Sequence, residues 1–131
     1  DEVIKPANST IDLKKGMFCS HQSMFFSYRY AALRYDLSYK LSADYDYTVR
    51  AVKMANNPDE ILHVDMVVAR FDMTGASSSR RVSGILEDFN LRIKNGLCSE
   101  LSSSMYFCRS LGLMWLKRFS YPFYMKMREL K

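Results

Sequence analysis

Two aspartates, Asp44 and Asp46, open a predicted helix within the stretch 35–51, YDLSYKLSADYDYTVRA. Ser42 or Asp44 is a suitable N-cap, and the helical pattern continues to about Met54. Side chains at positions i and i+2 of a helix point about 200° apart, so the two carboxylates would not share one task. The spacing leaves two interpretations open. One carboxylate is a general base at a cleft, or both stabilise the positive end of the helix dipole.

A loop rich in glycine and serine is the second place where the residue types suggest chemistry. The stretch 72–81, DMTGASSSRR, precedes a predicted helix, and Arg70 lies just before it. Gly75 and Ser77 at a helix N-terminus could cradle an anion with backbone N–H groups. The same residues could equally form a solvated connection with a serine N-cap.

The spacing of histidines and cysteines predicts neither a metal site nor a redox pair. Cys19, Cys98 and Cys108 are odd in number and widely spaced, without a CxxC motif, which is typical of free thiols in a reducing cytoplasm. His21 and Gln22 lie beside strand-like sequence. A single histidine there can be a structural residue or part of a site, and the pattern leaves both open.

Hydrophobic patterning predicts an α/β fold in one domain, since 131 residues suffice for one core. Runs rich in β-branched and aromatic residues predict short strands at 17–19, 23–26 and 61–71, with a period-two pattern at 37–41. Helical spacing predicts helices at 28–34, 42–54, 82–93, 99–118 and 123–130. Asn95 and Gly96 are a helix stop signal between the third and fourth of these helices.

The positive charge of the chain is concentrated at its C-terminal end. The net charge is +5, and residues 101–131 hold six basic residues against one acidic residue. Aromatic residues alternate with these cations, but the apolar run 111–116 is far shorter than the roughly 20 residues that span a bilayer. Such a segment suits a helix at an anionic membrane surface, a helix that binds nucleic acid, or a packing helix with a basic outer face.

Three separated motifs resemble the C-terminal half of family-two glycosyltransferases of the inverting GT-A type. They are HQSMFF at 21–26, RYDLSYKLSADYDY at 34–47 and ARFDMTGAS at 69–77, in the order found in that family. The closest resemblance is to bacterial enzymes of colanic-acid and other surface-polysaccharide synthesis. The resemblance covers about residues 17–96 and implies a partial GT-A-like fold of short mixed strands packed with helices, followed by a helical tail.

The resemblance also implies roles for individual residues. The carboxylate of Asp44 would be the general base that deprotonates the acceptor hydroxyl, with His21 and Gln22 at the floor of the acceptor cleft. Asp46 would support the loop or contact the acceptor. Arg70, Gly75 and Ser77 would lie near the donor diphosphate. The implied partners are a nucleotide-sugar donor and a saccharide or lipid-linked acceptor. Because the acceptor can be lipid-linked, we expect the tail to contact an anionic membrane surface and do not expect it to bind nucleic acid.

The chain departs from the family pattern at the donor side. We expect residues 1–96 to be the acceptor-side portion and 97–131 a basic amphipathic helical tail, without the nucleotide-binding half that would hold most ligands of a Mn²⁺ or Mg²⁺ ion. Asp44-Tyr45-Asp46 matches a metal-binding DxD pattern but stands at the place of the base motif. We therefore expect a cytoplasmic protein, peripheral to the inner membrane, inactive or weakly active alone, with an open sheet edge that favours self-association. The alternative is a non-catalytic module that binds membranes or nucleic acid through its tail.

Overall fold

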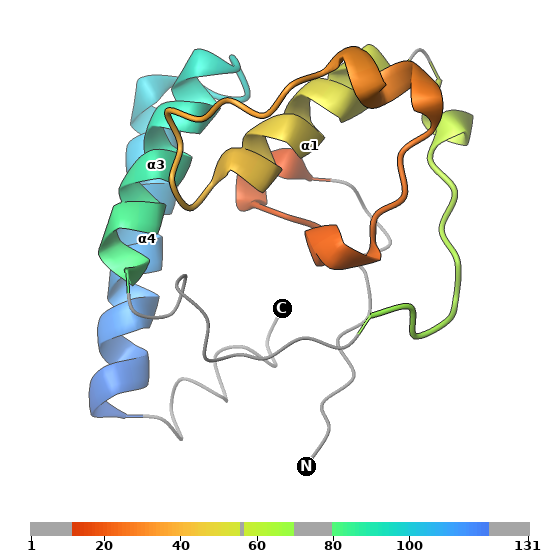
Figure 1. Ribbon diagram of the computed structural model, residues 1–131. Coiled ribbons are helices and arrows are strands. Elements are labelled where there is room, and N and C mark those ends of the chain that lie inside the picture. Colours follow the sequence, from red (N-terminus) through yellow and green to blue (C-terminus); the bar gives the residue numbers. More distant parts are fainter. Residues whose placement is uncertain (1–11, 56, 70–79, 121–131) are drawn as a thin grey trace.

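Helices and short turns make up the regular structure of the part of the chain that the structure describes. The computed structural model describes residues 12–55, 57–69 and 80–120 (Figure 1). The α-helices in this part are α1 (Ala43–Met54), α3 (Arg81–Lys94) and α4 (Glu100–Phe119). Four short 3-10 turns accompany them, at Leu13–Lys15, His21–Ser23, Tyr28–Ala32 and Pro58–Glu60. Helices α3 and α4 lie side by side, and α1 lies beside this pair (Figure 1).

The predicted α/β fold with short mixed strands is wrong, because the described residues contain no strand. The stretches 17–19 and 24–26 are irregular backbone on either side of the turn His21–Ser23, which includes the first residue of the strand predicted at 23–26, and 37–41 forms a turn. Most of the predicted strand 61–71 is described, and its backbone pairs with no other segment there. β-propensity records how a residue fits a pleated surface beside a neighbouring strand, so it cannot form a sheet where no neighbour pairs.

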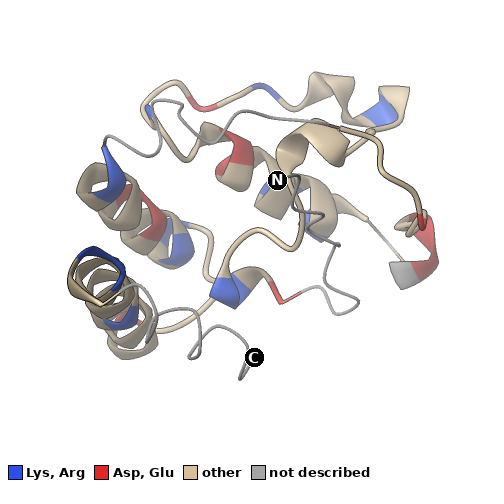
Figure 2. Ribbon diagram, turned by 90° about the horizontal axis from the view of Figure 1, so that it is seen from below, with Lys and Arg blue, Asp and Glu red and all other residues tan. Residues whose placement is uncertain are grey.

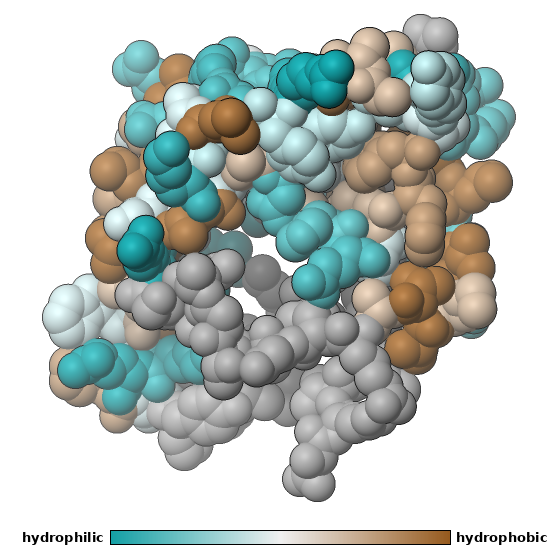
Figure 3. All heavy atoms as spheres, viewed as in Figure 1, coloured by the Kyte–Doolittle hydropathy of each residue, from teal (hydrophilic) through white to brown (hydrophobic). Residues whose placement is uncertain are grey.

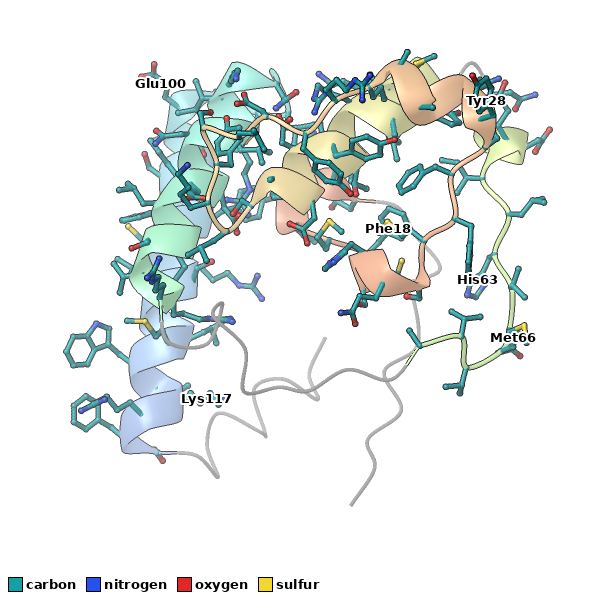
Figure 4. All side chains as sticks on the ribbon, in the orientation of Figure 1. Phe18, Tyr28, His63, Met66, Glu100 and Lys117 are labelled. Carbon is teal, nitrogen blue, oxygen red and sulfur yellow. The ribbon has the colours of Figure 1, made fainter. Side chains whose placement is uncertain are left out.

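The segment 57–69, a 3-10 turn at Pro58–Glu60 followed by extended backbone, shows what the β-rich pattern produces instead, and we call it the extended segment. Its apolar side chains point into solvent on both faces, with Leu62 at 84% and Met66 at 65% exposed. Figure 3 shows a cluster of hydrophobic residues on the side of the molecule where this segment runs. The labelled side chains His63 and Met66 lie along it in Figure 4.

Helix α1 confirms the predicted helix at 42–54 and supplies most of the core. Val49 is fully buried and packs with Leu13, Tyr45 and Leu91 of α3. The hydroxyl of Tyr45 donates to the backbone carbonyl of Leu13, and burial raises the pKa of Tyr45 to about 12. On another side of α1, Tyr47 and Ala51 form a second cluster with the aromatic turn that precedes the helix.

The connection between α3 and α4 follows the predicted stop signal. Gly96 has a φ of 58°, a left-handed conformation that favours glycine. The N–H of Gly96 donates to the carbonyl of Ile93, and that of Leu97 donates to the carbonyl of Arg92, both at 2.9 Å. This Schellman pattern satisfies the last carbonyls of α3 and turns the chain back into α4. The helices predicted at 82–93 and 99–118 are thus confirmed, while the helix predicted at 123–130 lies outside the described residues.

Candidate functional site

The predicted base lies in the first turn of α1 and contacts the predicted histidine. The Nδ1 atom of His21 lies 2.8 Å from Oδ2 of Asp44, and the side chain of Asp44 is 29% exposed. Oδ1 of the same carboxylate accepts the N–H of Tyr45 at 2.9 Å. The turn His21–Ser23 and the start of α1 are distant in sequence, and the fold brings together two residues for which the resemblance implies one cleft.

This pair has the chemistry of a proton acceptor. A carboxylate has about four lone-pair positions, so each oxygen of Asp44 can accept a further hydrogen bond from a ligand hydroxyl. The imidazole of His21 fixes the carboxylate by holding Oδ2. In one assignment Asp44 takes the proton and His21 positions it. In the other, Asp44 orients the ring and Nε2 of His21 takes the proton.

Glu87 of α3 binds the backbone segment that leads into α1 and Asp44. Its Oε2 accepts the N–H groups of Leu41 at 2.8 Å and Ser42 at 2.9 Å, and its Oε1 accepts the N–H of Lys40 at 3.1 Å. These bonds position the N-terminus of α1, and with it Asp44, against α3. The sequence analysis missed Glu87. The signal that could have found it was a pair of adjacent acidic residues, Glu87 and Asp88, in the middle of an amphipathic helix.

Asp88 completes the junction and borders a cavity. Its Oδ1 accepts the hydroxyl of Ser42 at 2.7 Å. Burial raises the pKa of Asp88, and the hydrogen bond from Ser42 opposes this shift. We call the contacts of Ser42 with Glu87 and Asp88, together with the first turn of α1, the α1–α3 junction.

A cavity of about 330 Å³ opens at this junction, within the size range of small-ligand sites. Asp44 and Asp88 line it, as do the basic residues Lys15, Arg81 and Arg92. Arg92 is buried, and its Nε donates to the backbone carbonyl of Lys14 at 2.8 Å. A lining that mixes carboxylates and cations suits a polar ligand with several hydroxyl groups. Figure 2 shows acidic and basic residues side by side on the helices.

Asp46 lies apart from this cavity. It is 2% exposed, its Oδ2 accepts the Nε–H of Arg50 at 2.7 Å, and its Oδ1 accepts the side-chain amide of Asn95 at 3.0 Å. Asp46 therefore ties α1 to the end of α3. The divergence of Asp44 and Asp46 agrees with the helical geometry expected from their spacing, and a contact of Asp46 with an acceptor stays a prediction.

Of the four remaining predicted site residues, the structure describes one, Gln22. Gln22 is exposed and shares the short turn with His21. Arg70, Gly75 and Ser77 lie outside the described residues, so their contact with a diphosphate stays a prediction.

The residues of the literal DxD pattern do not fit a shared Mn²⁺ or Mg²⁺ ion. Asp44 points to His21, whereas Asp46 is engaged by Arg50. No group of three or more His, Cys, Asp or Glu residues in the described ranges is arranged to hold a metal ion.

Comparison of the chain with protein-family models, curated proteins and solved structures finds no match. Within residues 12–55, 57–69 and 80–120, no helix is both long enough and apolar enough to cross a membrane.

Proposed function

We propose that the chain carries the acceptor side and the general base of an inverting glycosyltransferase of bacterial polysaccharide synthesis. The enzyme would move a sugar from a nucleotide-sugar to a saccharide or lipid-linked acceptor. The observation that supports this most is the 2.8 Å contact between His21 and Asp44, at the edge of a polar cavity. Two separated motifs that the resemblance assigns to one acceptor cleft meet there.

The chemistry requires one proton acceptor beside the sugar hydroxyl. As the hydroxyl oxygen bonds to the anomeric carbon, Asp44 takes its proton. The bond from that carbon to the diphosphate breaks, and the electron pair leaves with the nucleoside diphosphate on the opposite face. The configuration at the anomeric carbon is therefore inverted. A base positioned in this way contributes roughly 10²–10⁴-fold to the rate.

The surroundings of Asp44 would hold the base in place for this reaction. His21 restrains one carboxylate oxygen, and Glu87 holds the backbone N–H groups that precede α1. Fixing a reacting group before the substrate arrives removes part of the entropic barrier. Because the donors are nucleotide-sugars and polysaccharide assembly uses lipid-linked acceptors, we expect the protein to act in the cytoplasm, peripheral to the inner membrane.

The proposal is tested by sugar transfer in the full-length protein that carries this sequence. Labelled UDP-sugars and GDP-sugars are supplied with Mn²⁺ or with EDTA, and with free or lipid-linked saccharides as acceptors. Proton NMR of the product then gives its anomeric configuration. We expect transfer that depends on the acceptor and inverts the configuration. A product of retained configuration, or donor cleavage that ignores the acceptor, would contradict the proposal.

A pair of variants assigns the base between the two contacting residues. If Asp44 is the base, Asp44→Asn removes almost all transfer, whereas His21→Gln retains a measurable part because the carboxylate remains. The dependence of kcat on pH should keep its acidic limb in His21→Gln. If His21→Gln is the more damaging change and removes that limb, the base is His21.

A further inference from the structure

Helix α4 carries an exposed apolar stripe along its whole length. The residues of this stripe recur at alternating intervals of four and three positions: Leu101, Met105, Cys108, Gly112, Trp115 and Phe119. At 3.6 residues per turn, all six lie within about 40° of one line along the helix. The four large members are well exposed, Leu101 at 75%, Met105 at 68%, Trp115 at 54% and Phe119 at 74%. We call these six residues the α4 stripe.

The stripe faces away from α3. The opposite face of α4 makes the packing contacts: Ser103 is fully buried and its hydroxyl donates to the carbonyl of Phe89 at 3.1 Å. The ring of Phe107 meets that of Phe89 edge-on at 5.8 Å. Packing within the hairpin therefore does not explain the stripe, and large apolar groups along one line of a helix mark an interaction surface.

Charge favours an anionic partner for this surface. Arg109 and Arg118 flank the stripe, one on each side, at about 80° and 100° from its centre line. Glu100, at the first turn, is the one acidic residue of α4. Figure 2 shows the basic residues on this helix. A second copy of the chain would bring arginines against arginines without matching carboxylates.

We propose that the α4 stripe binds the surface of a bilayer that contains anionic lipid. The helix would lie in the plane of the surface, with its apolar side chains below the headgroups and Arg109 and Arg118 among the phosphates. Trp115 and Phe119, whose rings stack at 5.4 Å, would lie at the headgroup boundary that aromatic residues favour. This inference does not depend on glycosyl transfer, so either can fail without the other.

Trp115 gives a direct readout, because it is the only tryptophan of the chain. The full chain is titrated with vesicles of phosphatidylcholine plus phosphatidylglycerol, and with vesicles of phosphatidylcholine alone. We expect a blue shift of the fluorescence and flotation with the anionic vesicles, both weakened by added salt. Equal binding to both kinds of vesicle, or no blue shift with either, would overturn the proposal.

Three single substitutions separate the stripe from general positive charge. Phe119→Ser should weaken partitioning at least about ten-fold, and Arg118→Ser about five-fold. Lys117→Ser is the matched control, since it removes the same charge one position away. Lys117 lies about 160° from the stripe, on the side of α4 that faces the centre of the molecule (Figure 4). Its loss should change partitioning less than two-fold, by the same geometry.

Two results would identify a different partner. If Lys117→Ser and Arg118→Ser weaken binding equally, the contact is diffuse charge and the proposed face is wrong. If sedimentation without vesicles shows a dimer that Phe119→Ser dissociates, and anionic vesicles do not compete with it, the stripe binds a second copy of the chain. Circular dichroism confirms that each variant keeps its helices.

Discussion

The α1–α3 junction and the extended segment 57–69 differ in how many hydrogen-bond and packing partners other elements supply to them. At the junction, the carboxylate of Glu87 accepts hydrogen bonds from three consecutive backbone N–H groups, and that of Asp88 accepts the hydroxyl of Ser42. In the extended segment, Leu62 and Met66 are exposed, and the backbone bonds are short-range, from Glu60 to Asn57 and from Met66 to Val64, both at 3.0 Å. The difference shows that a defined structure here depends on how many partners a neighbour supplies: at the junction they hold successive backbone groups, whereas in the segment it is Glu60, near one end, that contacts Arg29 and Tyr30.

This difference bears on where chemistry can occur. A general base must hold its place to within a fraction of an ångström, and the junction fixes Asp44 through contacts with two other elements. Carboxylates also occur in the extended segment, such as Asp59, but they stand on backbone with few contacts.

A matched pair of leucines should show the largest contrast. Leu91 of α3 is fully buried beside Val49, so Leu91→Ala should lower the free energy of unfolding by about 2–5 kcal/mol. Leu62→Ala, in the extended segment at 84% exposure, should change it by less than about 0.5 kcal/mol. Urea unfolding followed by circular dichroism measures both. Similar losses would mean that the extended segment is packed in solution.

Glu87→Ala should be the most damaging polar substitution at the junction. It leaves the N–H groups of Leu41 and Ser42 without their acceptor, at a cost of about 1–3 kcal/mol, while Glu87→Gln keeps one acceptor oxygen and costs less. The control is Glu60→Ala, which removes the contact with Arg29 and should cost under about 1 kcal/mol. Amide hydrogen exchange at Leu41 and Ser42 should accelerate only in the Glu87 variants. Unchanged protection there would show that Glu87 does not hold α1.

Asp88→Asn should change how stability depends on pH. Burial raises the pKa of Asp88 in the fold above its ordinary value of 3.8, so the folded state favours the protonated form. The stability contributed by that form is present below the ordinary pKa and is lost as the pH rises through the folded-state pKa. Asp88→Asn cannot ionise, and it can still accept the hydroxyl of Ser42. Thermal melts from about pH 3 to about pH 8 should therefore show the parent losing stability relative to the variant as the pH rises. A difference in the other direction would mean that the carboxylate is stabilised in the fold.

Two glycines should give the smallest effects, with opposite signs. A methyl group on Gly84, near the start of α3, would lie 3.7 Å from Leu41, an ordinary contact, so Gly84→Ala should stabilise the protein by about 0.5–1 kcal/mol. Gly96→Ala should destabilise it by about 1–2 kcal/mol at most, because φ is 58° there. Melting temperatures measure both changes. A destabilising Gly84→Ala would show that the junction is packed more tightly than the distances indicate.

The sequence predicted the helices because their signals are local. The apolar spacing over 82–93 and the Asn95-Gly96 stop act within a few residues, and α3 and the turn before α4 follow them. Helix α1 begins after Ser42 as predicted, but the hydroxyl of Ser42 donates to Asp88 of α3 and does not cap the helix. The strands could not be predicted in the same way, since a strand exists only with a partner. The run 61–71 has the composition of a strand, yet its described part pairs with nothing in the described residues.

The acidic residues of the predicted helix start could be analysed from the sequence, whereas the residues that hold the candidate site in place could not be predicted from it. The helical spacing of Asp44 and Asp46 correctly predicted that the two side chains diverge. Only the resemblance placed His21 beside Asp44, since nothing in their spacing implies contact. The roles of Glu87 and Asp88 depend on how α3 packs on α1, a long-range arrangement that no short motif encodes.

The central claim is that Asp44, held at the α1–α3 junction, accepts the proton of the attacking sugar hydroxyl. The most direct test compares kcat for sugar transfer in Asp44→Asn and Asp59→Asn of the full-length protein. Both variants replace an aspartate by asparagine, one at the α1–α3 junction and one in the segment 57–69. We predict that Asp44→Asn lowers kcat by about 10²–10⁴-fold with an unchanged melting temperature, while Asp59→Asn stays within about two-fold of the parent. Full turnover in Asp44→Asn would remove Asp44 from the role of base.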